Sequence, residues 1–350
     1  MLIVSAGLIY WYVVKDGADK YPRPEFDVNT IPKFDKITLD YKTYYNSAKS
    51  LPIVGSAAFD IDNDNRDELF IGNGVGSEAG IFKFILNKFE NVTEQVNFKK
   101  PDLNESIYGI ASLDFDNNGF VDLLISGKDA VYLYLNEMGK FSNPINLNLI
   151  FNDRSQPASI TYTDLNQDGH ADLFISTYLH KNQMEGQTIF NKPNYGSTSE
   201  LFLNNGDKTF KNITREAGLD YIHNTFTAAF VEINNDTLVD LVVAYDTGEP
   251  RIYRNIGNLK FELVQTPLTG KYSYPMGIAV GDYDNNGFQD FMFSNVGKTL
   301  PAAFLRGDLN RSQKLVTDWI LLSNQGNCQF IDDAIKSKIA NYEFSWGAVF

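Results

Sequence analysis

A chain of 350 residues is long enough for one large domain or two ordinary ones, and 43% hydrophobic with 21% charged residues is a globular composition. The formal net charge of −14 would repel nucleic-acid phosphates, so no nucleic-acid partner is expected. The single cysteine, Cys328, excludes an intrachain disulfide and a cysteine-built zinc site, and three histidines leave little for a histidine-built metal centre. The 26 Phe and 19 Tyr residues favour β-strands.

The first residues form an uncharged run, Leu2 to Val14, that is shorter than the roughly 20 residues needed to cross a bilayer. Aromatic residues near its end suit a membrane interface. We interpret residues 1–14 as the remaining part of an export signal or as an N-terminal membrane anchor, with a buried first strand as the alternative. Residues 15–32 contain three prolines (Pro22, Pro24 and Pro32) and are expected to be a linker.

An aspartate-rich segment then recurs along the chain, starting at Asp60, Asp114, Asp164, Glu232 and Asp282. A strand of small residues precedes it, as in Gly109 to Leu113. An apolar strand, an Asn/Gly turn and a second strand opening with Phe follow it, as in Leu203 to Phe210, which indicates a hairpin. Four short strands in each repeat are typical of a propeller blade.

The sequence therefore predicts an all-β fold, a β-propeller of four-stranded blades over residues 33–350. The blades are expected near residues 52–105, 106–155, 156–223, 224–273 and 274–343, with the start of another at residue 344. Ser345 to Phe350 matches the strand that precedes each aspartate segment, and the sequence ends where its loop would begin. We therefore expect the chain to be a fragment of a longer protein, with a truncated propeller.

The aspartate segment has the residue types of a calcium loop. Its first, third and fifth positions carry acids or Asn, its sixth is usually Gly, and its ninth is Asp or Glu. Oxygen ligands without nitrogen or sulfur donors favour calcium over zinc or copper, and a glycine supplies the positive φ that wraps the loop. The carbonyl at the seventh position and both oxygens of the ninth carboxylate are further candidate ligands. The candidate side-chain ligands are Asp60, Asp62, Asp64 and Glu68; Asp114, Asp116, Asn118 and Asp122; Asp164, Asn166, Asp168 and Asp172; Glu232, Asn234, Asp236 and Asp240; and Asp282, Asp284, Asn286 and Asp290.

Two better-known calcium loops do not fit these residues. An EF-hand needs an acid at the twelfth position, where this chain has apolar residues such as Ile71 and Phe293, and the same residues argue against a dockerin-type loop. Asp, Asn and Gly also form turns without metal. Asn65 replaces Gly in the first loop, and Asn tolerates that conformation. Thr237 replaces the glycine in the Glu232 loop, and for this loop calcium binding and a turn without metal both remain alternatives. Four or five structural calcium ions are thus expected.

These residues resemble the FG-GAP/VCBS repeat family, which includes the integrin alpha head and many exported bacterial proteins. Leu201 to Phe210, followed by Asn212 to Leu219, is most similar to the bacterial repeats that precede an ASPIC/UnbV domain. The resemblance covers about residues 52–350. It implies a calcium-containing β-propeller, usually of seven blades, outside the membrane: periplasmic, at the cell surface or secreted. The worn copy at Glu232 and the incomplete last copy depart from the family pattern, and no ASPIC/UnbV segment is present.

We expect a non-enzymatic binding or adhesion module, with a protein or glycan ligand on one propeller face. The insertion from Tyr178 to Ser199 is the best candidate for partner contact. Aromatic residues are candidates for the binding surface, or else they cover strand ends: Tyr178, Phe190, Tyr195, Tyr272 and Tyr274. The alternatives are a scaffold subunit of an envelope complex and a polysaccharide lyase or hydrolase. The acids and bases available to such an enzyme have no visible partner: Glu185, Glu200, Glu216, Glu249, His180 and His223.

Overall fold

The computed structural model describes residues 35–44, 51, 53–102, 104–184, 195–297, 305–340 and 344–348. The predicted signal or anchor and linker lie outside the described residues, as do Glu185 and Phe190. The chain divides into two compact units. One contains Lys33–Met184 and Ser197–Tyr221, and the other contains Ile222–Phe350. No helix in the described part of the chain has the length and apolar character needed to span a membrane.

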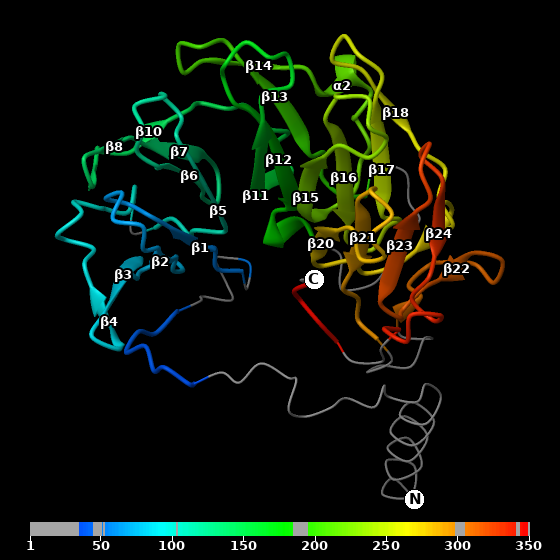
Figure 1. Ribbon diagram of the computed structural model, residues 1–350, viewed down its shortest axis with the longest axis horizontal. Coiled ribbons are helices and arrows are strands. Elements are labelled where there is room, and N and C mark those ends of the chain that lie inside the picture. Colours follow the sequence, from blue (N-terminus) through cyan, green and yellow to red (C-terminus); the bar gives the residue numbers. More distant parts are fainter. Residues whose placement is uncertain are drawn as a thin grey trace, which may run out of the picture. The chain divides into compact units, whose positions relative to one another are not determined.

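Within the described residues the strands form five four-stranded antiparallel sheets, so the all-β prediction is confirmed (Figure 1). In each of these five sheets the strands pair in chain order. Three sheets lie in the first unit: β1 (Ser56–Phe59), β2 (Glu68–Ile71), β3 (Gly80–Ile85) and β4 (Lys88–Asn91); β5 (Gly109–Leu113), β6 (Asp122–Ser126), β7 (Val131–Tyr134) and β10 (Ile145–Asn146); β11 (Ser155–Thr163), β12 (Asp172–Leu179), β13 (Glu200–Asn204) and β14 (Phe210–Asn212).

Two more four-stranded sheets lie in the second unit. They are β15 (Thr225–Val231), β16 (Asp240–Tyr245), β17 (Arg251–Asn255) and β18 (Phe261–Leu263), and then β20 (Ile278–Gly281), β21 (Asp290–Phe293), β23 (Ile320–Asn324) and β24 (Phe330–Asp332). The remaining elements are short: β8 (Asn136–Glu137), β9 (Lys140–Phe141), β19 (Lys271–Tyr272), β22 (Lys314–Leu315), η1 (Lys181–Gln183) and α2 (Thr214–Ala217).

Each aspartate segment lies in the hairpin between the first two strands of a sheet, as predicted. In all five hairpins the ninth loop residue is the first residue of the second strand and pairs with the residue just before the loop. The pairs are Phe59 with Glu68, Leu113 with Asp122, Thr163 with Asp172, Val231 with Asp240, and Gly281 with Asp290. This register carries the ninth carboxylate from the loop into the sheet, where it becomes buried.

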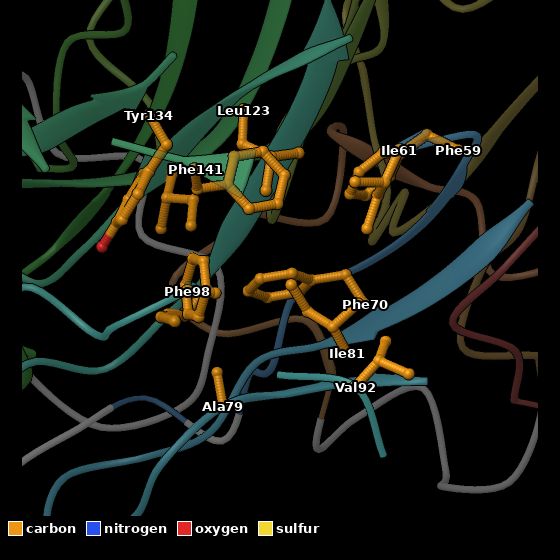
Figure 2. Packing of buried hydrophobic residues seen from close by; sticks show 12 residues of the cluster. Phe59, Ile61, Phe70, Ala79, Ile81, Val92, Phe98, Leu123, Tyr134 and Phe141 are labelled. Carbon is orange, nitrogen blue, oxygen red and sulfur yellow. The ribbon is translucent and has the colours of Figure 1, made fainter. Parts of the chain in front are cut away.

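The second strands of the second, third and fourth sheets are apolar because both of their faces are covered. In β6, Leu123 and Ile125 pack toward the first sheet, among Phe70, Phe98 and Tyr134, whereas Leu124 packs toward the third sheet. Figure 2 shows the first of these clusters, in which the rings of Phe70 and Phe98 meet edge to face at 5.0 Å. A strand that is buried on both faces reads as a continuous apolar run and not as an alternating one.

The first strands of successive sheets lie beside one another within each unit, and small residues permit the approach. In the first unit β5 contacts both β1 and β11, and in the second unit β15 contacts β20. A Cβ atom on Gly109 would lie 2.2 Å from the carbonyl oxygen of Ala158, so a larger residue is excluded there. A Cβ atom on Gly277 would lie 2.8 Å from the backbone nitrogen of Ala348, in the last described segment.

Three of the aromatic residues considered for a binding surface are buried: Tyr178, Tyr195 and Tyr274. Tyr274 belongs to an apolar cluster with Val296, Leu305 and Leu309, and its hydroxyl donates to the Leu305 carbonyl at 2.7 Å. Of the two alternatives left open for these residues, their burial excludes the exposed binding surface. Tyr272 is half-buried.

Removing a side chain from the shared core should cost far more than the same change at a turn. Leu123 is fully buried in the cluster of Figure 2, whereas Leu86, in the β3–β4 turn, is 89% exposed. We expect Leu123→Ala to lower the free energy of unfolding by about 2–5 kcal/mol, and Leu86→Ala to change it by less than about 0.5 kcal/mol. Urea unfolding followed by circular dichroism measures both. Equal losses would contradict this packing.

Candidate metal centre

The first carboxylate of each loop holds the turn closed through backbone hydrogen bonds. Asp114 accepts from the backbone N–H of Asn118 at 3.0 Å and from that of Gly119 at 2.9 Å. Asp60, Asp164 and Asp282 make the same pair of bonds to the fifth and sixth residues of their loops. The longer side chain of Glu232 instead accepts hydrogen bonds from the backbone N–H groups of Asn234, Asn235 and Asp236 on one oxygen.

The sixth position is left-handed in all five loops, as the glycines predicted. Gly119, Gly169 and Gly287 have φ of 87° to 89°, and Asn65 adopts 64°. Thr237 adopts 73°, a conformation that strains a β-branched residue. The fourth position is also left-handed, at Asn63, Asn117, Gln167, Asn235 and Asn285. The amide residue that recurs at this fourth position is a further sequence signal of the loop, which the predicted pattern did not include.

The ninth carboxylate links each loop to the rest of its sheet. In the second sheet, Asp122 Oδ2 accepts from the backbone N–H of Phe115 at 2.8 Å, and Oδ1 accepts from that of Asn136 at 2.6 Å. The side chain of Asn136 in turn donates to the carbonyl of Val121 at 3.0 Å and to that of Ile61, in the neighbouring loop, at 2.8 Å. Equivalent asparagines contact Asp172, Asp240 and Asp290: Asn204, Asn255 and Asn324. These asparagines were not among the predicted site residues, although each begins the predicted Asn/Gly turn.

Burial leaves the ninth carboxylates without enough stabilisation of their charge. Burial, with a smaller effect of nearby loop acids, raises the pKa of Asp122, Asp172 and Asp240 to about 6 against the lowering effect of the backbone N–H donors. The pKa values of Asp290 and Glu68 are raised for the same reason. Each oxygen still has a lone pair that a cation can use.

Three loops bring three carboxylates together. One oxygen from each lies within 4.8 Å of the others in the sets Asp60, Asp62 and Glu68; Asp114, Asp116 and Asp122; and Asp282, Asp284 and Asp290. The loops starting at Asp164 and Glu232 have Asn166 and Asn234 at the third position, where the other three have aspartate. Among the described residues, the acidic triads are therefore found where the third position is an acid.

The fifth position is turned toward the loop backbone. Asn118, Asp168, Asp236 and Asn286 each accept the N–H of the seventh residue through a side-chain oxygen, at 2.8 to 2.9 Å. In the loop starting at Asp164, Asn166 donates to Asp168 at 2.8 Å, and this bond lowers the pKa of Asp168. Convergent carboxylate and amide oxygens fit a hard divalent cation such as calcium.

The first loop differs because a lysine reaches it. Lys83, on β3, places Nζ 2.8 Å from Asp62, 2.8 Å from Asp64 and 3.1 Å from Glu68. Burial by itself would lower the pKa of Lys83, but hydrogen bonds to these three carboxylates raise it above its usual value. The same lysine lowers the pKa of Asp64. Lys83 lies outside the repeated segment and was not predicted to belong to the site.

The candidate catalytic side chains that are described each have a structural partner. Glu249 pairs with Arg251 at 2.5 Å and accepts the backbone N–H of Gly270 at 2.6 Å. Glu216 pairs with Lys211, Glu200 accepts from Asn212, and His180 lies 4.0 Å from Asp129. His223 is buried, and burial lowers its pKa to about 4. Cys328 is free and half-buried.

Comparison with known protein families finds the same repeat in this chain. Residues 114–175 and 232–293 match the FG-GAP-like repeat, which confirms the resemblance seen in the sequence. Cartilage acidic protein 1 of Homo sapiens is 25% identical over 273 residues, which cover 69% of this chain and 38% of that protein. The chain thus spans well under half the length of this relative. The chain carries FG-GAP-like repeats and is distantly similar to cartilage acidic protein 1.

Two solved structures also align over most of the chain. The V. cholerae biofilm matrix protein Bap1 has a TM-score of 0.42 and 14% identity, covering 83% of this chain and 41% of that one. An Agrocybe aegerita lectin with specific recognition of non-reducing terminal N-acetylglucosamine has a TM-score of 0.38 and 14% identity, covering 82% and 83%.

The raised pKa values predict a pH dependence whose sign depends on calcium. A buried carboxyl whose pKa in the folded chain is about 6 stabilises the fold while it is protonated. This stabilisation is lost as the pH rises and the carboxyl ionises. In calcium-depleted buffer the free energy of unfolding should fall as the pH rises from about 5 to about 7, by on the order of 1 kcal/mol for each such carboxyl. Saturating calcium should remove this fall, because it binds the deprotonated form.

Urea unfolding at several pH values, with and without calcium, measures this dependence. Carboxyls whose pKa is lowered, such as Asp64 and Asp168, titrate below this window and serve as an internal control. A calcium-depleted chain that grows more stable from pH 5 to pH 7 would contradict the account.

Proposed function

We propose that this chain of FG-GAP-like repeats is an exported, calcium-binding β-propeller that acts as a non-enzymatic binding module for a protein or glycan. The observation that carries the proposal is the matched pair of aspartate triads at Asp114 and Asp282, each ending in a buried carboxylate. Identical ligand positions in two hairpins of separate sheets need a shared reason, and a bound cation provides one.

The propeller is supported by the way in which sheets meet within each unit. First strands lie side by side, the second strands β6, β12 and β16 are buried along their whole length, and each sheet has four antiparallel strands that pair in chain order. These are the features of adjacent blades. A total of seven blades, and closure by chain outside this sequence, are part of the proposal. The chain covers 38% of cartilage acidic protein 1, so the remaining blades and the partner of the whole protein are also part of the proposal.

Calcium would be structural in this proposal. In the loops starting at Asp114 and Asp282, the three carboxylates of each triad would hold it. In the loop starting at Asp164, the amide oxygen of Asn166 takes the place of one carboxylate. The Glu232 loop carries the strain at Thr237 and is the weakest candidate. The ion would neutralise the buried ninth carboxylate and couple metal binding to the stability of each hairpin.

The hairpin turns offer candidate contact points for a partner. Large apolar side chains are exposed there, with Leu86 89% exposed and Met138 81% exposed in the same unit. Binding residues are often carried on surface loops. We propose that the hairpin turns and the insertion at residues 178–199 contact the partner. Export, to the periplasm, the cell surface or the medium, is proposed from the family resemblance.

Calcium should raise the melting temperature through the triads. In millimolar calcium we expect a rise of about 5 °C or more over calcium-depleted buffer, with a much smaller effect of magnesium. Asp116→Asn, at an exposed ligand position, should reduce this rise. Asp207→Asn removes the same charge from a turn outside the loops and should leave the rise unchanged. Differential scanning calorimetry measures all three chains. No rise in the wild-type chain would contradict calcium binding.

The binding function is tested with a glycan array and immobilised extracellular proteins, probed with the calcium-loaded chain. We expect retention of at least one ligand, and its loss in a Leu86→Ser/Met138→Ser variant that melts at the wild-type temperature. A matched Ile335→Ser variant changes an exposed apolar residue elsewhere and should still bind. Release of reducing ends from a polysaccharide in the same screen would instead establish the enzyme.

A further inference from the structure

The first loop contains its own cation. Lys83 Nζ lies within 3.1 Å of carboxylate oxygens from Asp62, Asp64 and Glu68. Asp62 and Glu68 belong to the acidic triad of this loop. The lysine side chain is only 18% exposed and that of Glu68 only 2%, so this is not a solvent-separated surface pair. The contact of Lys83 with Asp62 is a charge-assisted hydrogen bond of 2.8 Å, and such bonds are among the stronger ones in proteins.

The register of the sheets shows what the other loops have at this position. Phe82 pairs with Leu69 in the first sheet, and the equivalent residues in the other sheets are Tyr134, Phe202, Tyr253 and Leu322. The next residue is Lys83 in the first sheet and Leu135, Leu203, Arg254 or Ser323 in the others. Arg254, the only other cation in this set, pairs with Glu262 on β18 at 3.1 Å.

Three further residues of the first repeat depart from the pattern around the same point. Phe84 stands where the other sheets have an asparagine, and the backbone N–H that donates to the ninth carboxylate in those sheets makes no such bond to Glu68 among the described residues. The ninth residue is Glu68, one methylene longer than the aspartate of the other loops, and its Oε1 faces Lys83 at 3.1 Å. The sixth is Asn65, not Gly. Lys83 thus supplies a positive charge next to Glu68 Oε1, where this backbone hydrogen bond is missing.

We propose that Lys83 replaces calcium in the first loop, so that this hairpin is closed by an internal ammonium and does not bind the metal. The inference rests on the proposed function, in that it leaves calcium to the other loops. A tethered ammonium is present at any calcium concentration. A calcium ion would have to displace it and break three ion pairs. The first hairpin therefore stays formed when calcium is removed, whereas the other hairpins loosen.

The experiment compares the wild-type chain with Lys83→Met, Lys88→Met and Asp62→Asn. Lys88→Met is the matched control, because Lys88 lies on the adjacent strand and pairs with Glu90 at the exposed surface. Melting temperatures are measured in calcium-depleted buffer, and bound calcium is counted by equilibrium dialysis. Asp62 is about half exposed, so Asp62→Asn keeps the test decisive even if Lys83→Met does not fold.

In calcium-depleted buffer, Lys83→Met should melt at least about 2 °C below Lys88→Met. It should also bind one calcium more than the wild type, and Asp62→Asn should bind as many as the wild type. Loss of one calcium in Asp62→Asn would overturn the proposal, because the first loop would then hold metal. Equal melting of Lys83→Met and Lys88→Met would also overturn it. A wild-type chain that binds no calcium would refute the proposed function but leave the melting comparison valid.

Discussion

The structure depends on one constraint, a carboxylate buried at the point where each aspartate loop enters its sheet. The hairpin register makes the ninth loop residue the first residue of a central strand, so its side chain is withdrawn from water. Two backbone N–H groups donate hydrogen bonds to this carboxylate, as at Asp122, but they do not neutralise its charge. A buried carboxylate without a counter-charge is costly. The loop is the part of the sheet that can bring a cation to it.

This constraint explains why the loop and the sheet vary together. Where the third position is an acid, three carboxylates converge, and where it is Asn166 or Asn234 they do not. In the first repeat, a lysine on the third strand supplies the positive charge, and the second backbone hydrogen bond to the ninth carboxylate that the other sheets form is absent at Glu68 among the described residues. A metal ion and an ammonium group can thus each neutralise the buried ninth carboxylate.

Much of this arrangement could be predicted from the sequence because it is local. The spacing of the acids, the left-handed sixth residue, including Asn65, and the placement of loops in hairpins all follow from about a dozen consecutive residues. The role of Lys83 could not be predicted from the sequence, because it depends on the pairing of β2 with β3. The sequence left exposure or burial of Tyr178 and Tyr274 open for a related reason, since an aromatic residue outside the repeated segment gives no sign of which cluster it will join.

The most direct test of the account is long-wavelength anomalous diffraction from crystals of this chain grown in calcium. The account predicts anomalous peaks within the loops starting at Asp114 and Asp282, next to the buried carboxylates of Asp122 and Asp290. It predicts no peak in the loop starting at Asp60, where Lys83 provides the charge. Ordered loops at Asp114 and Asp282 without any peak would contradict the central claim that a bound cation neutralises these carboxylates.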